Sequence, residues 1–454
     1  MEMEEAITLV VWSALLLSLG CGAPPLPSPP PVAARLAAPA VVRPVAAPHR
    51  VVWSERGQLT ARSYALSEHH GYVSITTDGE RGLQDTLYRV DLRNGFARSR
   101  DFVSLAVVSA SPLLVRRTQG ETLALDTELE TLWTSSQDPM SHLVGVQGGL
   151  MLLTHFGPHP YTSAVDVSTG EERLRTDSML GNSASMVGTD FIAFVSADGD
   201  SLLFFDPTTG EATGQVSLAD VVAGGAVAGR HLVVAFDDRI VAFDRTGAER
   251  WSRQVRGLVV PAPDALEQVI VVEGRGGRDI VALSADDGLP RWRYRSPESF
   301  SQDIWFDGDY VWLANESGQI LFGDTGQPGL QCRRCVRSGS DFFRLDVEGA
   351  EGRVTRVSEG GVEVWRSELL PIVDRGGGPR LPEINRHAVA LCGAGGQLSL
   401  LDRGDGQILE RMNLPTEWGH GDGNRNRCTL RATEDAFLAI SGGGATVIAF
   451  GASE

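Results

Sequence analysis

Few side chains in this sequence have the types and spacing that chemistry requires, and its histidines are the first to consider. His155 and His159 lie four residues apart, a spacing that suits metal binding only on a helix. The prolines and the glycine around them argue against a helix. We therefore expect an exposed loop with two surface imidazoles, and a similar exposed turn at Glu68, His69 and His70.

Three acidic loops carry the oxygen ligands that calcium prefers, at residues 198–200, 307–309 and 422–423. None has the twelve-residue EF-hand pattern, and Asp-Gly pairs are also ordinary hairpin turns. No Gly-x-Ser-x-Gly nucleophile motif is present. We assign no catalytic, cofactor-binding or metal-ligating residue, and calcium stays an open alternative.

The five cysteines are Cys21, Cys332, Cys335, Cys392 and Cys428. If Cys21 carries a lipid, four remain, and four cysteines in an oxidising compartment indicate disulfides. We favour Cys332 with Cys335 and Cys392 with Cys428, because the first pair is close in sequence and the second is about one repeat apart. A four-cysteine zinc site would need a second close pair, and a haem site would need His where Val336 stands.

A sequence motif that recurs about every 40 residues indicates which elements position these side chains. Each copy has a short apolar strand, a small polar residue, a glycine turn and, in several copies, a tryptophan. Nearly even spacing of nine such copies indicates a repeat architecture. The anchors are Asp91, Asp126, Asp166, Asp206, Asp244, Ser284, Asp324, Ser358 and Asp402.

Each part of the motif has a structural task. The Asp can accept backbone N–H groups within the turn, and the Gly supplies a positive φ. The Trp can fill the wedge between neighbouring sheets. The aromatic stretch 305–312 alternates around an Asp-Gly turn, which favours core filling over a binding patch. The motif residues that we expect to be structural are Asp91, Asp126, Trp133, Asp166, Gly170, Asp206, Gly210, Asp244, Gly247, Trp251, Gly288, Trp292, Asp402 and Gly406.

Four short strands in each repeat of this length predict a β-propeller blade. The segments 164–174 and 282–292 resemble the Ala-x-Asp-x-x-Thr-Gly-x-x-x-Trp signature of the pyrroloquinoline-quinone-like (PQQ-like) repeat family, with Leu174 in the Trp place and Ser284 in the Asp place. The resemblance covers roughly residues 50–453 and implies an all-β fold with a single propeller. Seven or eight blades are usual in the family. We expect about eight four-stranded blades, within a range of seven to ten.

The resemblance also implies two functional classes. Quinoprotein dehydrogenases of the family have an adjacent Cys-Cys pair, a catalytic Asp and calcium ligands, and no adjacent Cys-Cys pair exists here. The chain is more similar to the lipoproteins of outer-membrane barrel assembly, which implies a monomeric, non-catalytic scaffold for envelope proteins. A PQQ-dependent dehydrogenase, or another ligand-binding enzyme with its site at the propeller axis, is the alternative.

The N-terminus resembles a bacterial lipoprotein signal. Residues 6–19 are mostly apolar and too short to span a bilayer comfortably, and Ser18-Leu19-Gly20 precedes Cys21. We expect a signal peptide over 1–20, lipid on Cys21, a Pro/Ala-rich linker over 21–49 and the propeller over 50–454. Ser18 and the acidic residues 2–5 depart from that pattern, so an ordinary secretory signal or an uncleaved anchor stays open.

The expected location is therefore extracytoplasmic, in the periplasm or at the outer membrane. The formal net charge is −18, whereas nucleic-acid and anionic-membrane surfaces attract proteins with a basic face. The composition therefore argues against nucleic acid as a partner, and leaves the lipid as the expected contact with a membrane.

Overall fold

The structure is a computed structural model. It describes residues 49–56, 64–79, 82–102, 105–110, 113–117, 121–136, 141–147, 149–156, 161–177, 186–188, 190–196, 199–219, 222, 224–261, 268–273, 278–298, 304–313, 318–372, 381–393, 396–414, 428–441 and 444–451. Residues Ala46–Glu454 form one compact unit. The expected signal peptide, Cys21 and most of the expected linker lie outside the described residues.

Ten antiparallel sheets are formed by the described residues, and nine of them use strands that are consecutive in the chain. The first five are β2 (Tyr64–Leu66), β3 (His70–Gly79), β4 (Gly82–Asp91) and β5 (Ala97–Phe102); β6 (Leu105–Ala110), β7 (Leu113–Arg117), β8 (Glu121–Leu125) and β9 (Thr131–Ser136); β10 (Ser141–Gln147), β11 (Leu150–His155), β12 (Tyr161–Asp166) and β13 (Glu172–Thr176); β14 (Met186–Val187), β15 (Ile192–Val195), β16 (Ser201–Phe205) and β17 (Ala212–Ser217); and β18 (Gly224–Ala228), β19 (His231–Ala235), β20 (Ile240–Phe243) and β21 (Glu249–Arg253).

The next four sheets continue the series. They are β22 (Gly257–Pro261), β23 (Gln268–Glu273), β24 (Asp279–Ser284) and β25 (Pro290–Arg295); β26 (Ile304–Asp307), β27 (Tyr310–Leu313), β28 (Gln319–Phe322) and β29 (Pro328–Gln331); β30 (Cys335–Ser338), β31 (Asp341–Glu348), β32 (Glu351–Ser358) and β33 (Glu363–Arg366), with β34 (Leu370–Pro371) also paired to β32; and β35 (Glu383–Ile384), β36 (Ala388–Cys392), β37 (Gln397–Asp402) and β38 (Ile408–Asn413).

The last sheet combines the two ends of the propeller. Its order is β1 (His49–Arg56), β41 (Gly444–Phe450), β40 (Ala436–Ser441) and β39 (Thr429–Ala432). Strand β1 pairs antiparallel with β41, from His49 opposite Phe450 to Arg56 opposite Gly444. Strand β1 therefore begins at the last residue of the expected linker and closes the ring.

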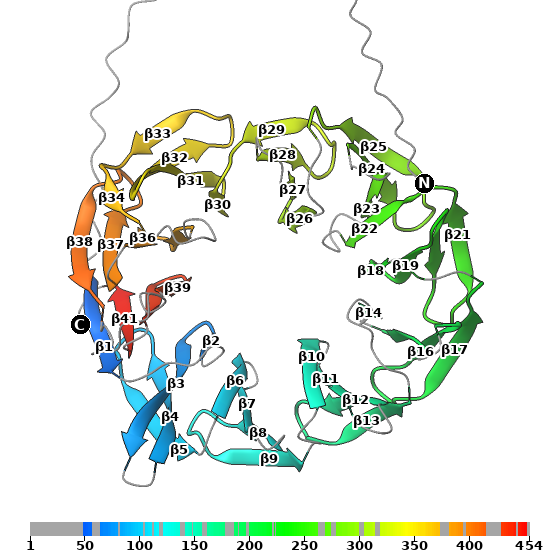
Figure 1. The fold of residues 1–454 in the computed structure, drawn as a ribbon, viewed down its shortest axis with the longest axis horizontal. Coiled ribbons are helices and arrows are strands. Elements are labelled where there is room, and N and C mark those ends of the chain that lie inside the picture. The colour runs from blue at the N-terminus through cyan, green and yellow to red at the C-terminus, as the bar shows by residue number, and fades with distance from the viewer. Residues whose placement is uncertain are drawn as a thin grey trace, which may run out of the picture. The chain divides into compact units, whose positions relative to one another are not determined.

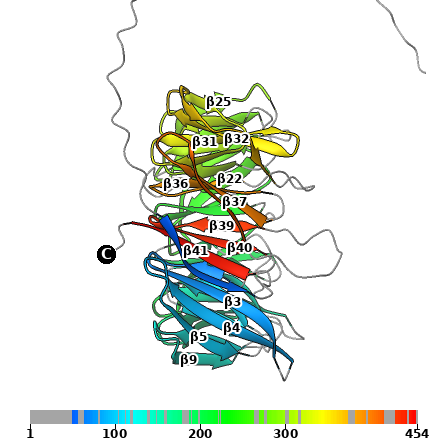
Figure 2. The same cartoon turned by 90° about the vertical axis from the view of Figure 1, so that its left-hand side faces the viewer.

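The sheets follow one another around a ring (Figure 1). In nine of them the first strand lies towards the centre and the fourth at the rim, whereas in the closing sheet β39 lies towards the centre and β1 at the rim. Figure 2 shows the same sheets from the side. Each sheet therefore has neighbours on both of its faces, as in a β-propeller.

This arrangement explains the apolar pattern of the strands. All six residues of β11 and all seven of β41 are buried, because middle strands pack against neighbouring blades on both faces. At the rim only alternate residues are covered: in β21, Trp251 is buried whereas Arg250 and Ser252 are exposed. Period-two alternation therefore survives in the sequence chiefly at the outer strands.

Ten hydrophobic clusters lie between consecutive sheets of the described chain, one at each blade interface. The cluster between the β18–β21 and β22–β25 blades, for example, includes Val233, Trp251 and Val271. The ring is completed where Val73 and Ile75 pack with Leu438 and Val447 of the last sheet. Burial is thus spread around the ring instead of being concentrated in one central core.

The described chain forms ten blades and not about eight, at the upper end of the expected range of seven to ten. Nine blades each contain one of the nine repeat turns, between their third and fourth strands. The tenth has no such turn, because its outer strand β1 comes from the other end of the propeller. The expectation of about eight blades came from the number usual in the family, and not from the spacing of the nine anchors.

Candidate functional site

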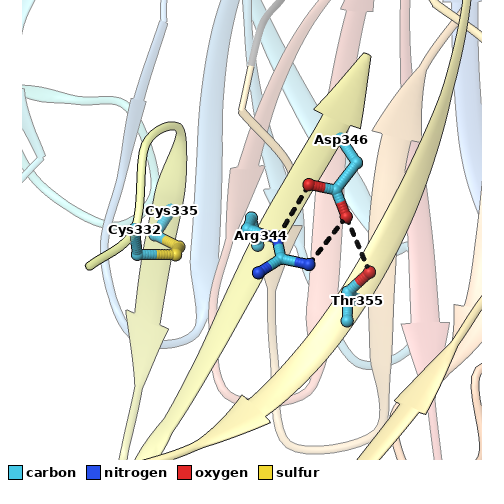
Figure 3. The surroundings of a disulfide bond; sticks show 5 residues. All are labelled: Cys332, Cys335, Arg344, Asp346 and Thr355. Atoms are coloured by element: carbon cyan, nitrogen blue, oxygen red, sulfur yellow. Dashed lines mark hydrogen bonds and ion pairs between the residues drawn. A yellow bond between two sulfur atoms is a disulfide. The ribbon is translucent and has the colours of Figure 1, made fainter. Parts of the chain in front are cut away.

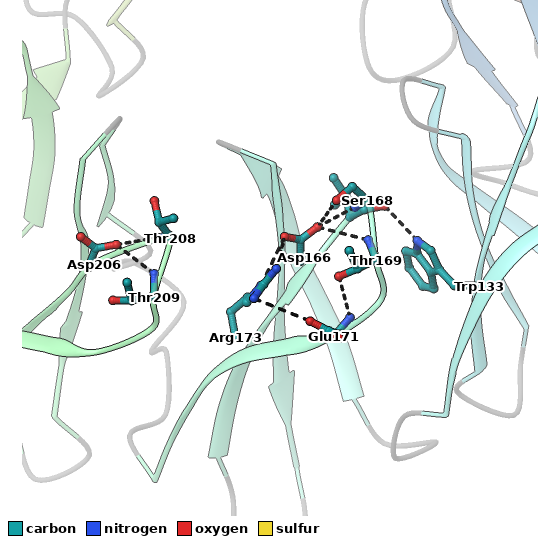
Figure 4. A network of polar contacts seen from close by, with 10 residues as sticks. Trp133, Asp166, Ser168, Thr169, Glu171, Arg173, Asp206, Thr208 and Thr209 are labelled. Carbon is teal, nitrogen blue, oxygen red and sulfur yellow. Dashed lines mark hydrogen bonds and ion pairs between the residues drawn. The ribbon is translucent and has the colours of Figure 1, made fainter.

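The repeated aspartates lie in the turns between third and fourth strands, and their carboxylates are occupied by those turns. Asp166 Oδ1 accepts hydrogen bonds from the backbone N–H groups of Ser168 at 2.8 Å and Thr169 at 3.2 Å, and from the Ser168 hydroxyl at 2.6 Å. Its other oxygen accepts from Arg173 at 3.2 Å. Figure 4 shows this network beside the equivalent Asp206 turn. The carboxylate holds the turn closed.

The same arrangement recurs in the other Asp-anchored blades. Oδ1 of Asp206 accepts from the N–H groups of Thr208 and Thr209 at 2.7 and 3.0 Å. Backbone N–H groups of the turn are also bound by Asp91, Asp126, Asp244 and Asp402. These carboxylates therefore accept hydrogen bonds from the backbone of their own turns.

These contacts lower the pKa of the turn carboxyls. The Ser168 hydroxyl is the first cause for Asp166, and the Thr209 N–H is the first for Asp206. Desolvation raises the pKa of Asp244, but the hydrogen bonds donated by Thr246 and Ala248 outweigh it and the pKa is lowered. All three side chains are therefore ionised at neutral pH.

The anchor residue of one repeat, expected at Asp324, lies at a different position in the structure. Gly326 N donates to the Phe322 carbonyl oxygen, as Gly170 N does to Asp166, so Phe322 and not Asp324 occupies the anchor position. Asp324 is exposed two residues further along the turn. The hydrogen-bonded turn forms without the carboxylate because its backbone pattern is unchanged.

Four tryptophans each connect their own blade to the next. Trp133 Nε1 donates to the Val167 carbonyl oxygen at 3.0 Å, and Trp251 Nε1 donates to that of Ala285 at 2.8 Å. Each indole lies on a turn glycine of the following blade. The four indole–glycine pairs are Trp133 with Gly170, Trp251 with Gly288, Trp292 with Gly326 and Trp365 with Gly406.

Trp365 was not singled out in the sequence, although it belongs to this set. Its Nε1 donates to the Arg403 carbonyl oxygen at 2.9 Å. The signal that could have found it is its place seven residues after Ser358, which matches the seven residues between Asp244 and Trp251.

The two expected disulfides are present. One joins Cys332, just after β29, to Cys335 at the start of β30, next to the polar group of Arg344, Asp346 and Thr355 (Figure 3). The other joins Cys392 at the end of β36 to Cys428, just before β39. Both bonds connect consecutive blades. Because such bonds persist in oxidising compartments, they favour an extracytoplasmic location.

The expectation of a surface imidazole at His155 is wrong. His155 ends β11 and is 1% exposed, and its ring stacks on Tyr161 with centroids 3.9 Å apart. Its Nε2 is 2.9 Å from Ser163 Oγ, and the Arg175 guanidinium lies 3.8 Å from the Tyr161 ring centroid. Strand β11 includes His155, so its side chain is buried against β12 of the same sheet.

The aromatic stretch 305–312 contributes to the core where its side chains are described. Tyr310 and Trp312 are buried and pack with Phe342 of the next blade. The Tyr310 hydroxyl donates to the Glu359 carboxylate, and Arg337 lies 4.4 Å from the Tyr310 ring centroid. Burial, followed by the Glu359 contact, raises the pKa of Tyr310 to about 12, so this phenol stays protonated at neutral pH.

A charged group links the inner strands of three consecutive sheets. Arg431 in β39 donates to Glu383 of β35 at 3.2 Å, and its guanidinium lies 5.7 Å from the ring centroid of Tyr64 in β2. Burial raises the pKa of Glu383 despite the Arg431 charge. The ion pair and the ring contact connect the closing sheet to both of its neighbours.

The described residues include no group of three or more His, Cys, Asp or Glu side chains placed to hold a metal ion. The Asp-Gly loop at 307–309 forms the turn between β26 and β27. No helix in the described part of the chain has the length and apolar character needed to cross a bilayer.

Comparison with known proteins finds a family model that matches part of the chain. Residues 199–327 match a PQQ-type repeat model described as outer membrane protein assembly factor BamB. They cover β16 to β28, in which Asp turns, indole–glycine contacts and four-stranded sheets have just been described. This stretch of the chain is therefore similar to PQQ-like β-propeller repeats. No curated protein matches the sequence.

Several solved structures are similar to this propeller. BamB from Moraxella catarrhalis is 18% identical, with 68% of this chain and 98% of that chain covered and a TM-score of 0.37. The C-terminal WD40 domain of Sif2 is 11% identical, covering 90% and 100%, with a TM-score of 0.38. Dihydro-heme d1 dehydrogenase NirN is 13% identical, covering 64% and 68%, with a TM-score of 0.37. At these values no functional residue is transferred from them.

Proposed function

We propose that the protein is a non-catalytic scaffold that binds other proteins in a bacterial envelope. The observation that carries this proposal is the use of the repeated side chains: the Asp carboxylates bind turn N–H groups, and the indoles bind carbonyl oxygens of the next blade. These side chains build a rigid ring that leaves its loops and rim for partners. The partial match to the BamB repeat model supports the same class.

A lipid anchor on Cys21 completes the proposal. The apolar segment before Cys21 and the Pro/Ala-rich stretch after it have the composition of a lipoprotein leader and tether. The Cys332–Cys335 and Cys392–Cys428 bonds support the oxidising side of the inner membrane. The partners would then be envelope proteins within reach of the tether.

The anchor is tested by mass spectrometry of the native N-terminus and by fractionation of a Cys21→Ser variant. We expect a lipid mass on Cys21 and release of the variant from membranes. An unmodified Cys21 together with unchanged membrane association contradicts the anchor without affecting the scaffold proposal.

The scaffold function is tested by cross-linking in cells that produce the full chain, followed by affinity capture and identification of the captured proteins. Reproducible capture of a defined set of envelope proteins is expected. Recovery of the propeller alone, at native expression and with efficient cross-linking of a known envelope complex, contradicts it.

The enzyme alternative is tested separately with purified protein, PQQ and calcium. We expect no retained chromophore in the absorbance spectrum and no dye reduction with simple alcohols or aldoses. Stoichiometric PQQ retention or calcium-dependent dye reduction would move the protein to the quinoprotein dehydrogenases.

A further inference from the structure

The outer strand β25 differs in charge from the other outer strands of the ring. It contains Arg291, Arg293 and Arg295 and no acidic residue. Each other outer strand that carries arginine also carries Asp or Glu, as β5 does with Asp101 and β21 with Glu249. A basic strand at the rim is therefore a local exception in a chain whose formal charge is −18.

Two of the three arginines share one face of β25. Arg293 and Arg295 alternate with Trp292 and Tyr294, so they point to the opposite side from the indole. Arg291 precedes them at the β-bulge opposite Ala282 and Leu283. Trp292 fixes the strand on the next blade, because its Nε1 donates to the Gly323 carbonyl oxygen at 2.8 Å. The arginines are thus presented on a strand whose position is set by the packing beneath it.

The charges of this face are open to solvent. The side chains of Arg293 and Arg295 are 61% and 77% exposed. Arg293 lies 3.4 Å from Glu273 and Arg295 lies 3.8 Å from Asp279, and exposed ion pairs of this kind contribute little. Leu289, just before the strand, adds an apolar side chain that is 53% exposed.

The sheet ends at this strand. Its order is β22-β23-β24-β25, and β25 pairs with β24 only among the described strands. An edge strand presents a row of N–H and C=O groups to which another extended chain can pair. In a ladder of that kind, side chains that face each other across the strands lie about 5 Å apart at Cβ.

We propose that the edge of β25 is a docking site for an acidic extended segment of a partner protein, which adds to the sheet as a fifth strand. Acidic side chains at alternate positions of that segment would lie beside Arg293 and Arg295, while the backbones pair and Arg291 adds a third positive charge at the bulge. This inference rests on the proposed scaffold function and specifies one of its surfaces.

The same charges select against a second copy of the chain. Pairing of β25 with another β25 places arginine opposite arginine, and like charges across a ladder are destabilising. The edge therefore favours a heterologous acidic strand over self-association.

The docking site is tested with the full chain and a fluorescent peptide of four Glu-Thr repeats, which combines alternate carboxylates with a strand-forming residue. We expect saturable binding that weakens with salt, and at least tenfold weaker binding to the R291E/R293E/R295E variant. The R293Q/R295Q variant, which adds no acidic group, should also lose affinity. Unchanged melting of each variant shows that the blade is intact.

Two controls make the result specific. The R98E/R100E variant reverses charge on β5, another outer strand, and should bind the peptide as the wild type does. A peptide of four Gln-Thr repeats should bind at least tenfold more weakly. Equal affinity of wild type and both β25 variants for the Glu-Thr peptide overturns the proposal, as does equal affinity for the Gln-Thr peptide.

A photo-crosslinking residue in place of Leu289 separates this proposal from the scaffold function, with Leu132 on β9 as the matched control position, 61% exposed. Cross-links from position 289, lost in R291E/R293E/R295E, support the β25 site. If the same envelope proteins are captured with and without those three charges, the β25 site is overturned and the scaffold function stands. If the wild type captures none while the Glu-Thr peptide binds, the scaffold function fails and the edge preference remains.

Discussion

Trp251 covers Gly288 of the following blade, and a Cβ at Gly288 would lie 2.6 Å from Cε3 of the indole. The indole N–H binds the Ala285 carbonyl oxygen of the same turn. Gly288 also has a φ of 67°, a conformation that glycine adopts without strain. One glycine therefore meets two requirements at once, the tight turn and the close approach of the neighbouring blade.

We expect Gly288→Ala to destabilise the propeller by about 3 kcal/mol, from the left-handed backbone and from overpacking against Trp251. The measurement is the shift in thermal and urea midpoints. Gly199→Ala is the matched control, since Gly199 has a φ of 78° and no atom within 4 Å of an added Cβ. It should cost about 1 kcal/mol from backbone strain alone. Equal losses in the two variants contradict the role of the indole contact.

Asp166→Ala should lower stability at neutral pH by about 1 kcal/mol through loss of its turn hydrogen bonds. Because the folded-state pKa of Asp166 is lowered, this contribution is fully present above the unfolded pKa of about 3.9 and is lost as the pH falls through the folded-state value. The melting difference between variant and wild type should therefore narrow in acid.

The control for that measurement is Asp324→Ala, because Asp324 is exposed and is not the anchor of its turn. It should change stability by less than about 0.5 kcal/mol. A difference between Asp166→Ala and wild type that stays constant with pH would show that the carboxylate charge is not what the turn uses.

The two disulfides should differ in their contribution to stability. Cys392 and Cys428 are 36 residues apart, whereas Cys332 and Cys335 are 3 apart. In the chain-entropy account the longer loop stabilises by about 2 kcal/mol more. Chemical denaturation of Cys392→Ser/Cys428→Ser and Cys332→Ser/Cys335→Ser variants measures this, and the reverse order would contradict it.

Removal of residues 1–56 should open the ring, because β1 then no longer pairs with β41. We expect faster hydrogen exchange in β41 and loss of the monomer on gel filtration, since a new edge and apolar surface are exposed. A synthetic peptide of residues 49–56 should restore exchange protection. Unchanged protection in the truncated chain would show that β1 is dispensable for closure.

The repeat type and the blade turns could be predicted because Asp, Gly and Trp each perform a local task that leaves a trace in sequence. The closing sheet leaves no trace of this kind. Strand β1 carries no motif, and its pairing with β41 joins residues at opposite ends of the propeller. The anchor of one turn was also predicted incorrectly. Phe322 occupies the anchor position, and Asp324, two residues later, has the residue type expected there.

His155 shows a second limit of sequence reading. Its neighbours Gly157, Pro158 and Pro160 indicate a loop, yet His155 itself is still in β11 and lies under Tyr161. The composition around His155 describes a segment of several residues, whereas the strand ends at one particular residue. The basic face of β25 is visible only once the sheet order identifies which strands lie at the rim.

The closure of the ring also determines when folding of the propeller can be completed. Ser54 in β1 bonds to Thr446 in β41 at 3.1 Å, across 392 residues of chain. At ordinary rates of synthesis β1 exists for on the order of half a minute before its partner is made. During that interval β1 has no partner strand, and the charges of Arg50 and Glu55 disfavour its pairing with other chains. The first strand to be made is the last to be paired.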